Sequence, residues 1–216
     1  MKNLALLIVF TFSINAWSQI YSGATSTATG KTGRAAVEPG DAGFINAANL
    51  VHLKGRSFYS SYAPGELALA FTENAKDSLF PSSLGFFQHE FGDSTKIQDF
   101  RLAVAEFGTK KLAFGAAPHF YQVESNNKER KSQFDADIGM IFTPTENLGV
   151  ALVGYDLMED SKDIAEVHKP MAKSAFGLNY VYMSFLRVRF DLQSRRGHRW
   201  NDPSIGSGLE SYVNKW

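Results

Sequence analysis

The stretch Phe134-Asp135-Ala136-Asp137-Ile138-Gly139-Met140-Ile141-Phe142 alternates strictly between two kinds of side chain. Every second residue from Phe134 to Phe142 is apolar, whereas the residues between them are Asp135, Asp137, Gly139 and Ile141. Successive side chains of a β-strand point to opposite faces, so the stretch predicts a strand with one apolar face and one face that carries charges. The apolar face needs hydrocarbon or a protein core, and the charged face needs water. Strands of this kind that close on themselves can span a bilayer.

The same two-residue period continues through most of the chain beyond Gly55. Polar or Gly/Pro-bearing links, such as Gly108-Thr109-Lys110 and Pro144-Thr145-Glu146-Asn147, separate the segments. The pattern predicts an all-β fold, an antiparallel transmembrane β-barrel with about ten strands. The expected strands are Ser57 to Tyr62, Glu66 to Thr72, Ser83 to Phe91, Ile97 to Phe107, Lys111 to Glu124, Lys131 to Thr143, Leu148 to Leu157, Met171 to Met183, Phe185 to Arg196, and Ser204 to Val213.

A soluble β-sandwich is the main competing architecture, because its strands alternate in the same way with the apolar face turned inward. The polar faces of this chain mix charges with small residues, as in Arg101 beside Ala103 and Ala105. Solvent-facing strand positions usually prefer Thr, Lys or Glu. Small residues among charges therefore favour a crowded lumen.

The first 18 residues read as a signal peptide, with Lys2, the apolar run Leu4 to Phe12, and Ala16-Trp17-Ser18 before the expected cleavage. A short membrane anchor is the alternative, although polar Ser13 and Asn15 interrupt the run early. The chain has no cysteine, which excludes a disulfide framework and a lipoprotein anchor at the cleavage site. Its formal net charge is +0, so nothing in the balance indicates nucleic acid as a partner.

Between Gln19 and Gly43 the sequence is rich in Ser, Thr, Gly and Ala and shows no sustained period, which predicts irregular backbone. Asp41 to Leu53 then has apolar residues near helical spacing, so one short helical turn is expected there. A disordered N-terminus is the alternative.

The segment Gly33 to Leu50 resembles the N-terminal signature of the FadL/PorV-like outer-membrane proteins, which are barrels of the fatty-acid channel type. The likeness lies in Gly33-Arg34-Ala35, in Asp41-Ala42, and in Asn46-Ala47-Ala48-Asn49-Leu50 just before the first strand. In two respects the chain departs from the family pattern. Ala47 replaces the usual proline, and the chain is shorter than the family's barrels.

The resemblance implies that residues 19–53 form a plug inside a barrel of residues 54–216, and that hydrophobic molecules pass through. It also implies that Arg34, Asp41 and Asn46 belong to the plug motif, with Asp41 and Asn46 in polar contact with the wall. A plug is physically reasonable, because irregular backbone at membrane depth is tolerated where protein surrounds it. The final Trp216 is compatible with a natural end and with a longer barrel.

Five charged residues are expected to face the lumen and to contact a solute: Arg101, Asp135, Asp137, Arg187 and Arg189. Charges withdrawn from bulk water usually pair, so the two acids are expected to neutralise the three arginines. Alternatively, Asp135 and Asp137, which share a strand face, could hold a cation or act as an acid–base pair.

The sequence carries no sign of covalent chemistry, so we expect neither an enzyme nor a cofactor. The five histidines are scattered, with no pair at metal-ligand spacing, and no metal site is expected. The favoured function is passive transport of a hydrophobic or small amphipathic solute across a bacterial outer membrane, with outer-membrane lipid as a partner. One alternative is a barrel that anchors or shuttles surface or secreted proteins through charged links such as Glu159 to Lys169; another is a soluble secreted β-domain.

Overall fold

The computed structural model describes residue 21 and residues 23–92, 94–125, 129–158, 164, 170–195 and 203–211. Ten strands form the bulk of it, and three short helical segments precede them. The helical segments are α1 (Ala24–Ala28), α2 (Ala42–Ile45) and the 3-10 helix η1 (Ala47–His52). The strands are β1 (Gly55–Ala63), β2 (Glu66–Asn74), β3 (Ser82–Glu90), β4 (Lys96–Thr109), β5 (Leu112–Glu124), β6 (Arg130–Thr145), β7 (Leu148–Tyr155), β8 (Lys173–Tyr182), β9 (Leu186–Arg195) and β10 (Ser204–Ser211).

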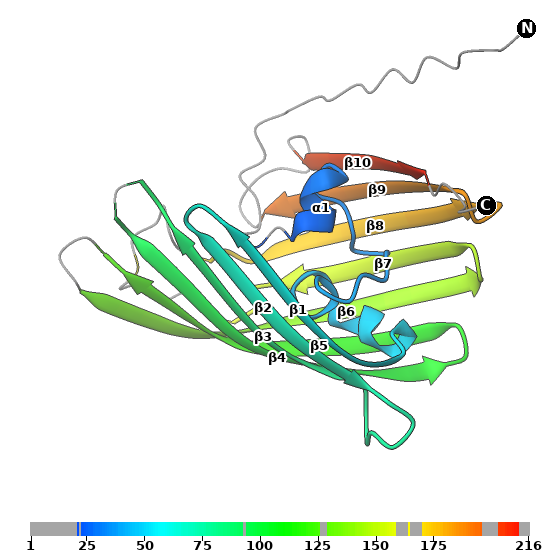
Figure 1. Ribbon diagram of the computed structural model, residues 1–216, viewed down its shortest axis with the longest axis horizontal. Helices are drawn as coiled ribbons and strands as arrows, with labels where there is room; N and C mark the ends of the chain where they lie inside the picture. Colours follow the sequence, from blue (N-terminus) through cyan, green and yellow to red (C-terminus); the bar gives the residue numbers. More distant parts are fainter. Residues whose placement is uncertain are drawn as a thin grey trace, which may run out of the picture.

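All ten strands expected from the alternation are present, which confirms the all-β prediction. They form one sheet in which each strand pairs antiparallel with the next, in the order β1 to β10. Short links between consecutive strands produce this nearest-neighbour order. Among the described residues no pairing joins β10 to β1, so these two strands are the edges of the sheet. Figure 1 shows the sheet strongly curved, with the helical segments inside the curve.

The orientation of the two strand faces distinguishes the barrel from the soluble sandwich. In β6, Phe134 and Ile138 are each 56% exposed, whereas Asp135 is 0% and Asp137 is 5% exposed. The apolar side chains therefore point away from the protein, and the acids point into the curve of the sheet. A soluble sandwich requires the opposite arrangement. The outward rows of many strands carry further exposed apolar side chains, such as Phe58, Phe71, Leu84, Phe100, Leu102, Phe114, Phe120, Leu152, Tyr180, Val188 and Leu209.

The sequence anticipated helical structure between Asp41 and Leu53, and α2 and η1 confirm it. It did not anticipate α1, which lies in the segment expected to be irregular. The Oγ1 of Thr29 donates to the carbonyls of Thr25 and Ser26 and closes this helix. Ser and Thr have weak helix propensity, so a five-residue helix of this composition leaves little periodic signal in the sequence. The expected signal peptide, 1–18, lies outside the described residues.

In the part of the chain that the structure describes, no helix is long and apolar enough to cross a membrane.

A charge on the outward face should be costly, and this is our first prediction. Replacing Ile138 by Lys places an ammonium group near the middle of β6 on its outward row. We expect the free energy of unfolding in lipid vesicles to fall by about 2–4 kcal/mol. Ser132→Lys, on the same outward row near the strand end, is the control and should cost about 0–1 kcal/mol. Equal effects of the two substitutions in urea titrations would contradict a lipid-facing row.

Candidate functional site

The inner face of the sheet carries all five charged residues that the sequence assigned to the lumen. Asp135, Asp137, Arg101 and Arg189 are buried, and Arg187 is partly buried. The alternation thus places each of them on the inward face, although it does not say which partner each one meets.

Arg101 of β4 is the centre of an ionic cluster on the inner wall. Its Nη1 lies 2.7 Å from Asp137 Oδ2, and its Nη2 lies 2.7 Å from Asp99 Oδ2. His119 of β5 completes the cluster, with Nδ1 3.1 Å from Asp99 Oδ1. Arg101 also donates to the carbonyl of Phe44 at 3.1 Å and lies over its ring at 5.6 Å. The wall cluster is therefore attached to α2.

The other charged residues do not pair as the sequence suggested. Among the described residues Asp135 pairs with no arginine; instead its carboxylate accepts hydrogen bonds from Gln133 Nε2 and from the backbone N–H groups of Ala136 and Met158. Strand register explains the difference, because the residue directly opposite Asp135 on β5 is His119. The expectation that both acids neutralise lumen arginines is thus correct for Asp137 and wrong for Asp135.

Arg187 and Arg189 of β9 bind two glutamates that the sequence did not single out. Glu38 Oε1, from the N-terminal segment, lies 2.7 Å from Arg187 and 2.5 Å from Arg189. Glu210 of β10 approaches the same two guanidinium groups at 3.4 Å and 2.5 Å. The pairing depends on the path of the chain before β1, which no spacing in the sequence reveals.

The plug, defined here as the described residues from Tyr21 to Leu53, is anchored to the wall by Arg34. Its Nη1 lies 2.9 Å from Asp191 Oδ2, and its Nη2 donates to Gln193 Oε1 at 2.8 Å. The backbone N–H groups of Gly33 and Arg34 donate to the same Asp191 oxygen. The guanidinium group also lies 5.5 Å from the centre of the Tyr155 ring. Arg34 is only 4% exposed, so these contacts are shielded from water.

Asp41 and Asn46, the other two residues of the motif, make their described hydrogen bonds within the plug. Asp41 accepts from the Tyr21 hydroxyl at 2.7 Å and from the Ser26 N–H at 3.2 Å. Burial raises the pKa of the Asp41 carboxyl, and these hydrogen bonds oppose that rise. Asn46 donates to the Arg34 carbonyl and caps η1 by accepting from Ala48 N–H. These two residues hold the plug in shape, and of the three motif residues Arg34 is the one whose described hydrogen bonds reach the wall.

Small wall residues let the plug backbone approach the sheet closely. A Cβ on Gly115 would collide with the backbone of Ala47 and Ala48, and one on Gly139 would collide with the Asn46 side chain. Ala103 and Ala113 pack against η1 from neighbouring strands, each with at most 1% exposure. The mixture of small residues and charges on the inward rows therefore has a steric cause.

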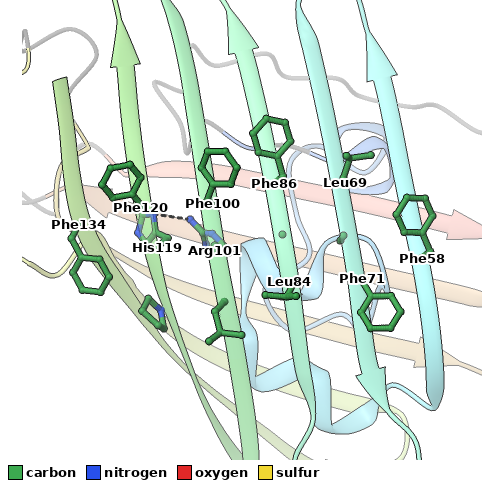
Figure 2. Close-up of a pocket in the computed structure, with 14 residues that line it drawn as sticks. Phe58, Leu69, Phe71, Leu84, Phe86, Phe100, Arg101, His119, Phe120 and Phe134 are labelled. Carbon is green, nitrogen blue, oxygen red and sulfur yellow. Dashed lines mark hydrogen bonds between the residues drawn. The ribbon is translucent and has the colours of Figure 1, made fainter. Parts of the chain in front are cut away.

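The outward face of β1 to β6 carries an apolar groove of about 650 Å³. Phenylalanine and leucine side chains line it, and Figure 2 shows them lying side by side on adjacent strands. At its floor the wall is thin, because Ala70 and Gly85 have little or no side chain. The plug lies directly behind Gly85, because a Cβ added to this glycine would stand 2.7 Å from Phe44 Cζ. We call this feature the outer groove; its side-chain lining is Phe58, Leu69, Phe71, Leu84, Phe86, Phe100, Leu102, Phe120 and Phe134.

An antiparallel strand meander with apolar side chains outside and a polar, plug-filled interior defines the transmembrane β-barrel class. The fold of one solved structure agrees with this class. The chain resembles the CymD monoaromatic hydrocarbon channel with a TM-score of 0.62 and 12% sequence identity, over 92% of this chain and 77% of that one. A looser likeness to the NanC porin has a TM-score of 0.46 and 11% identity, over 73% of this chain and 92% of that one. The sequence matches no protein-family model and no curated protein.

Proposed function

We propose that this chain is an outer-membrane β-barrel of the FadL/PorV-like kind that passes a hydrophobic or small amphipathic solute without covalent chemistry. The observation that carries the proposal is the outer groove, because its floor puts little or no side chain between the lipid-facing row and the plug. Its thin floor at Gly85 is backed by Phe44 of the plug. A solute that displaced this contact would reach the apolar side of the wall directly.

The energetics of such a route favour passage over storage. Acyl chains are as apolar as the phenylalanine and leucine side chains of the outer groove, so a solute gains little by staying there rather than entering lipid. Weak holding is what a passive channel requires, since a tightly bound solute would leave slowly. The polar interior and the plug would keep the path closed when no solute is present. The likeness in fold to a monoaromatic hydrocarbon channel supports the same class of solute.

Uptake of a hydrophobic dye tests the proposal. Cells with a lipopolysaccharide outer leaflet admit N-phenyl-1-naphthylamine slowly, and its fluorescence rises when it reaches a membrane. We expect the folded chain to speed the rise several-fold over cells without it. Gly115→Val should speed it further by unseating η1, whereas Gly92→Val, where a Cβ meets nothing within 4 Å, should behave as the parent chain.

Unchanged dye entry in cells that carry the folded chain would contradict transport. If surface proteins were lost on deletion while dye entry stayed the same, the anchoring or shuttling role would be supported instead. The link Glu159 to Lys169, expected as the partner surface for that role, lies outside the described residues except for Ile164.

A further inference from the structure

A small cavity lies on the inner side of the wall, between β5, β6 and the bend after β7. It has a volume of about 30 Å³ and is lined by charged and tyrosine side chains, including Asp99, His119, Asp137, Asp156 and Tyr155. A cavity of this size has room for a water molecule or for an ion with a water ligand. The proposed transport route does not use it.

Three side chains converge on this cavity in the manner of metal ligands. One donor atom from each of His119, Asp137 and Asp156 lies within 4.8 Å of the other two. His119 Nε2 is 3.6 Å from Asp137 Oδ1 and 3.8 Å from Asp156 Oδ1. Ligand atoms held about 2.0–2.1 Å from a tetrahedral Zn²⁺ lie about 3.3 Å apart, so the two distances from His119 Nε2 would need to shorten by only a few tenths of an ångström.

His119 is oriented for coordination. Its side chain is 2% exposed, and among the described residues its Nε2 has no hydrogen-bond partner. The opposite ring nitrogen, Nδ1, lies 3.1 Å from Asp99 Oδ1, which is closer than Arg101 Nη2 at 3.4 Å. A carboxylate that accepts from Nδ1–H fixes the tautomer and leaves the Nε2 lone pair free to bind a metal.

The charges around the cavity also favour a divalent cation. Four acids gather there, because Asp135 lies close enough to Asp156 to act on it electrostatically. The described cations that face them are Arg101, paired with Asp99 and Asp137, and Lys173, whose Nζ is 3.6 Å from Asp156 Oδ2. The carboxylates around the cavity thus outnumber the arginine and the lysine by four to two, and a divalent ion would offset this excess. Buried charge without such compensation is costly.

We propose that His119, Asp137 and Asp156 bind one divalent transition-metal ion of borderline softness, with Zn²⁺ as the best fit. One imidazole and two carboxylates are ligands that Zn²⁺ accepts, and the cavity leaves a fourth position for water. Bound there, the ion would join β5 and β6 to the bend after β7. Because Asp137 also pairs with Arg101, the ion would add a further link to the wall cluster beneath the plug. The ligands come from residues 119, 137 and 156 on three different segments, so their spacing along the chain gives no metal-binding signal.

The test uses the full chain folded in detergent and freed of metal by a chelator. Co²⁺ is added first, because its visible absorption reports nitrogen and oxygen ligands, and Zn²⁺ is then used to displace it. We expect one Co²⁺ per chain, displaced by one Zn²⁺, and a higher thermal unfolding midpoint with Zn²⁺. A folded parent chain that binds neither ion would overturn the proposal, and an NMR signal of doubly protonated His119 in that chain would explain the charge balance instead.

Two variants locate the site and one serves as control. His119→Asn keeps a donor toward Asp99 but removes the Nε2 ligand, and Asp156→Asn weakens the second ligand; each should lower Co²⁺ affinity by about tenfold or more. His89→Asn, on β3 beside Glu66, should leave the affinity unchanged. Heat-modifiable migration confirms that each variant is folded. Parent-like affinity in both ligand variants would overturn the assignment, and if a variant does not fold, the titration of the parent chain still decides.

Discussion

Replacement of Arg34 by Met is expected to detach the plug from the wall and to expose residues that are now buried. The substitution removes the ion pair with Asp191, the hydrogen bond to Gln193 and the contact with the Tyr155 ring. Asp191 would remain buried, with the backbone N–H groups of Gly33 and Arg34 as its described donors. Breaking one partner of a buried ion pair typically costs about 3–5 kcal/mol, and the seated state of the plug should be weakened by an amount of this order.

Cysteine labelling measures this effect cleanly, because the chain contains no cysteine of its own. Ala36 is 2% exposed in the plug, so a cysteine placed there reacts with a maleimide only when the plug opens. A loss of 3–5 kcal/mol corresponds to labelling that is faster by about 100-fold or more. Arg56→Met is the control: its side chain is 57% exposed and its pair with Glu73 is at the surface, so labelling should not change. Unaltered labelling in Arg34→Met would show that other contacts hold the plug.

The strands were predictable from the sequence because the outside and the inside of this wall demand opposite chemistry at every second residue. Phe134 to Phe142 shows this directly: the apolar row points outward and the acidic row inward, as the alternation indicated. Polar links locate the strand ends less closely, because Gly108 and Thr109 were expected in a link but are the last residues of β4, and Pro144 and Thr145 likewise belong to β6. Period and turn chemistry are local properties, and a single sequence contains them.

The partners of the charged residues were not predictable in the same way. Arg101 meets Asp137 and Asp99 because of strand register, whereas Arg189 meets Glu38 because of the path that the plug takes through the interior. His119 was overlooked for a related reason. It stands in an apolar context, Pro118-His119-Phe120, and only the antiparallel pairing with β6 brings it near Asp137. Alternation does place His119 on the inward row with Ala117 and Tyr121, which is the signal that could have drawn attention to it.

Replacement of Arg101 by Met should have the largest effect on the stability of the wall itself. The guanidinium group lies between Asp99 and Asp137, and its loss leaves these two acids buried beside Asp135 and Asp156, with His119 and Lys173 as the remaining basic side chains described in the cluster. The plug also loses the hydrogen bond to the Phe44 carbonyl. We expect the free energy of unfolding to fall by about 3–5 kcal/mol in urea titrations of the folded chain in detergent.

A double-mutant cycle with Asp137→Asn separates lost packing from uncompensated charge. If charge dominates, the second substitution removes one of the stranded acids, and the double variant should be more stable than the sum of the single effects by about 0.5–3 kcal/mol. The titrations need a chelator, because a cation bound at His119 would replace the missing positive charge and hide the effect. Strict additivity would mean that Arg101 acts mainly through its contacts with the plug, and in that case Arg101→Met should speed labelling of a cysteine at position 36 as strongly as Arg34→Met does.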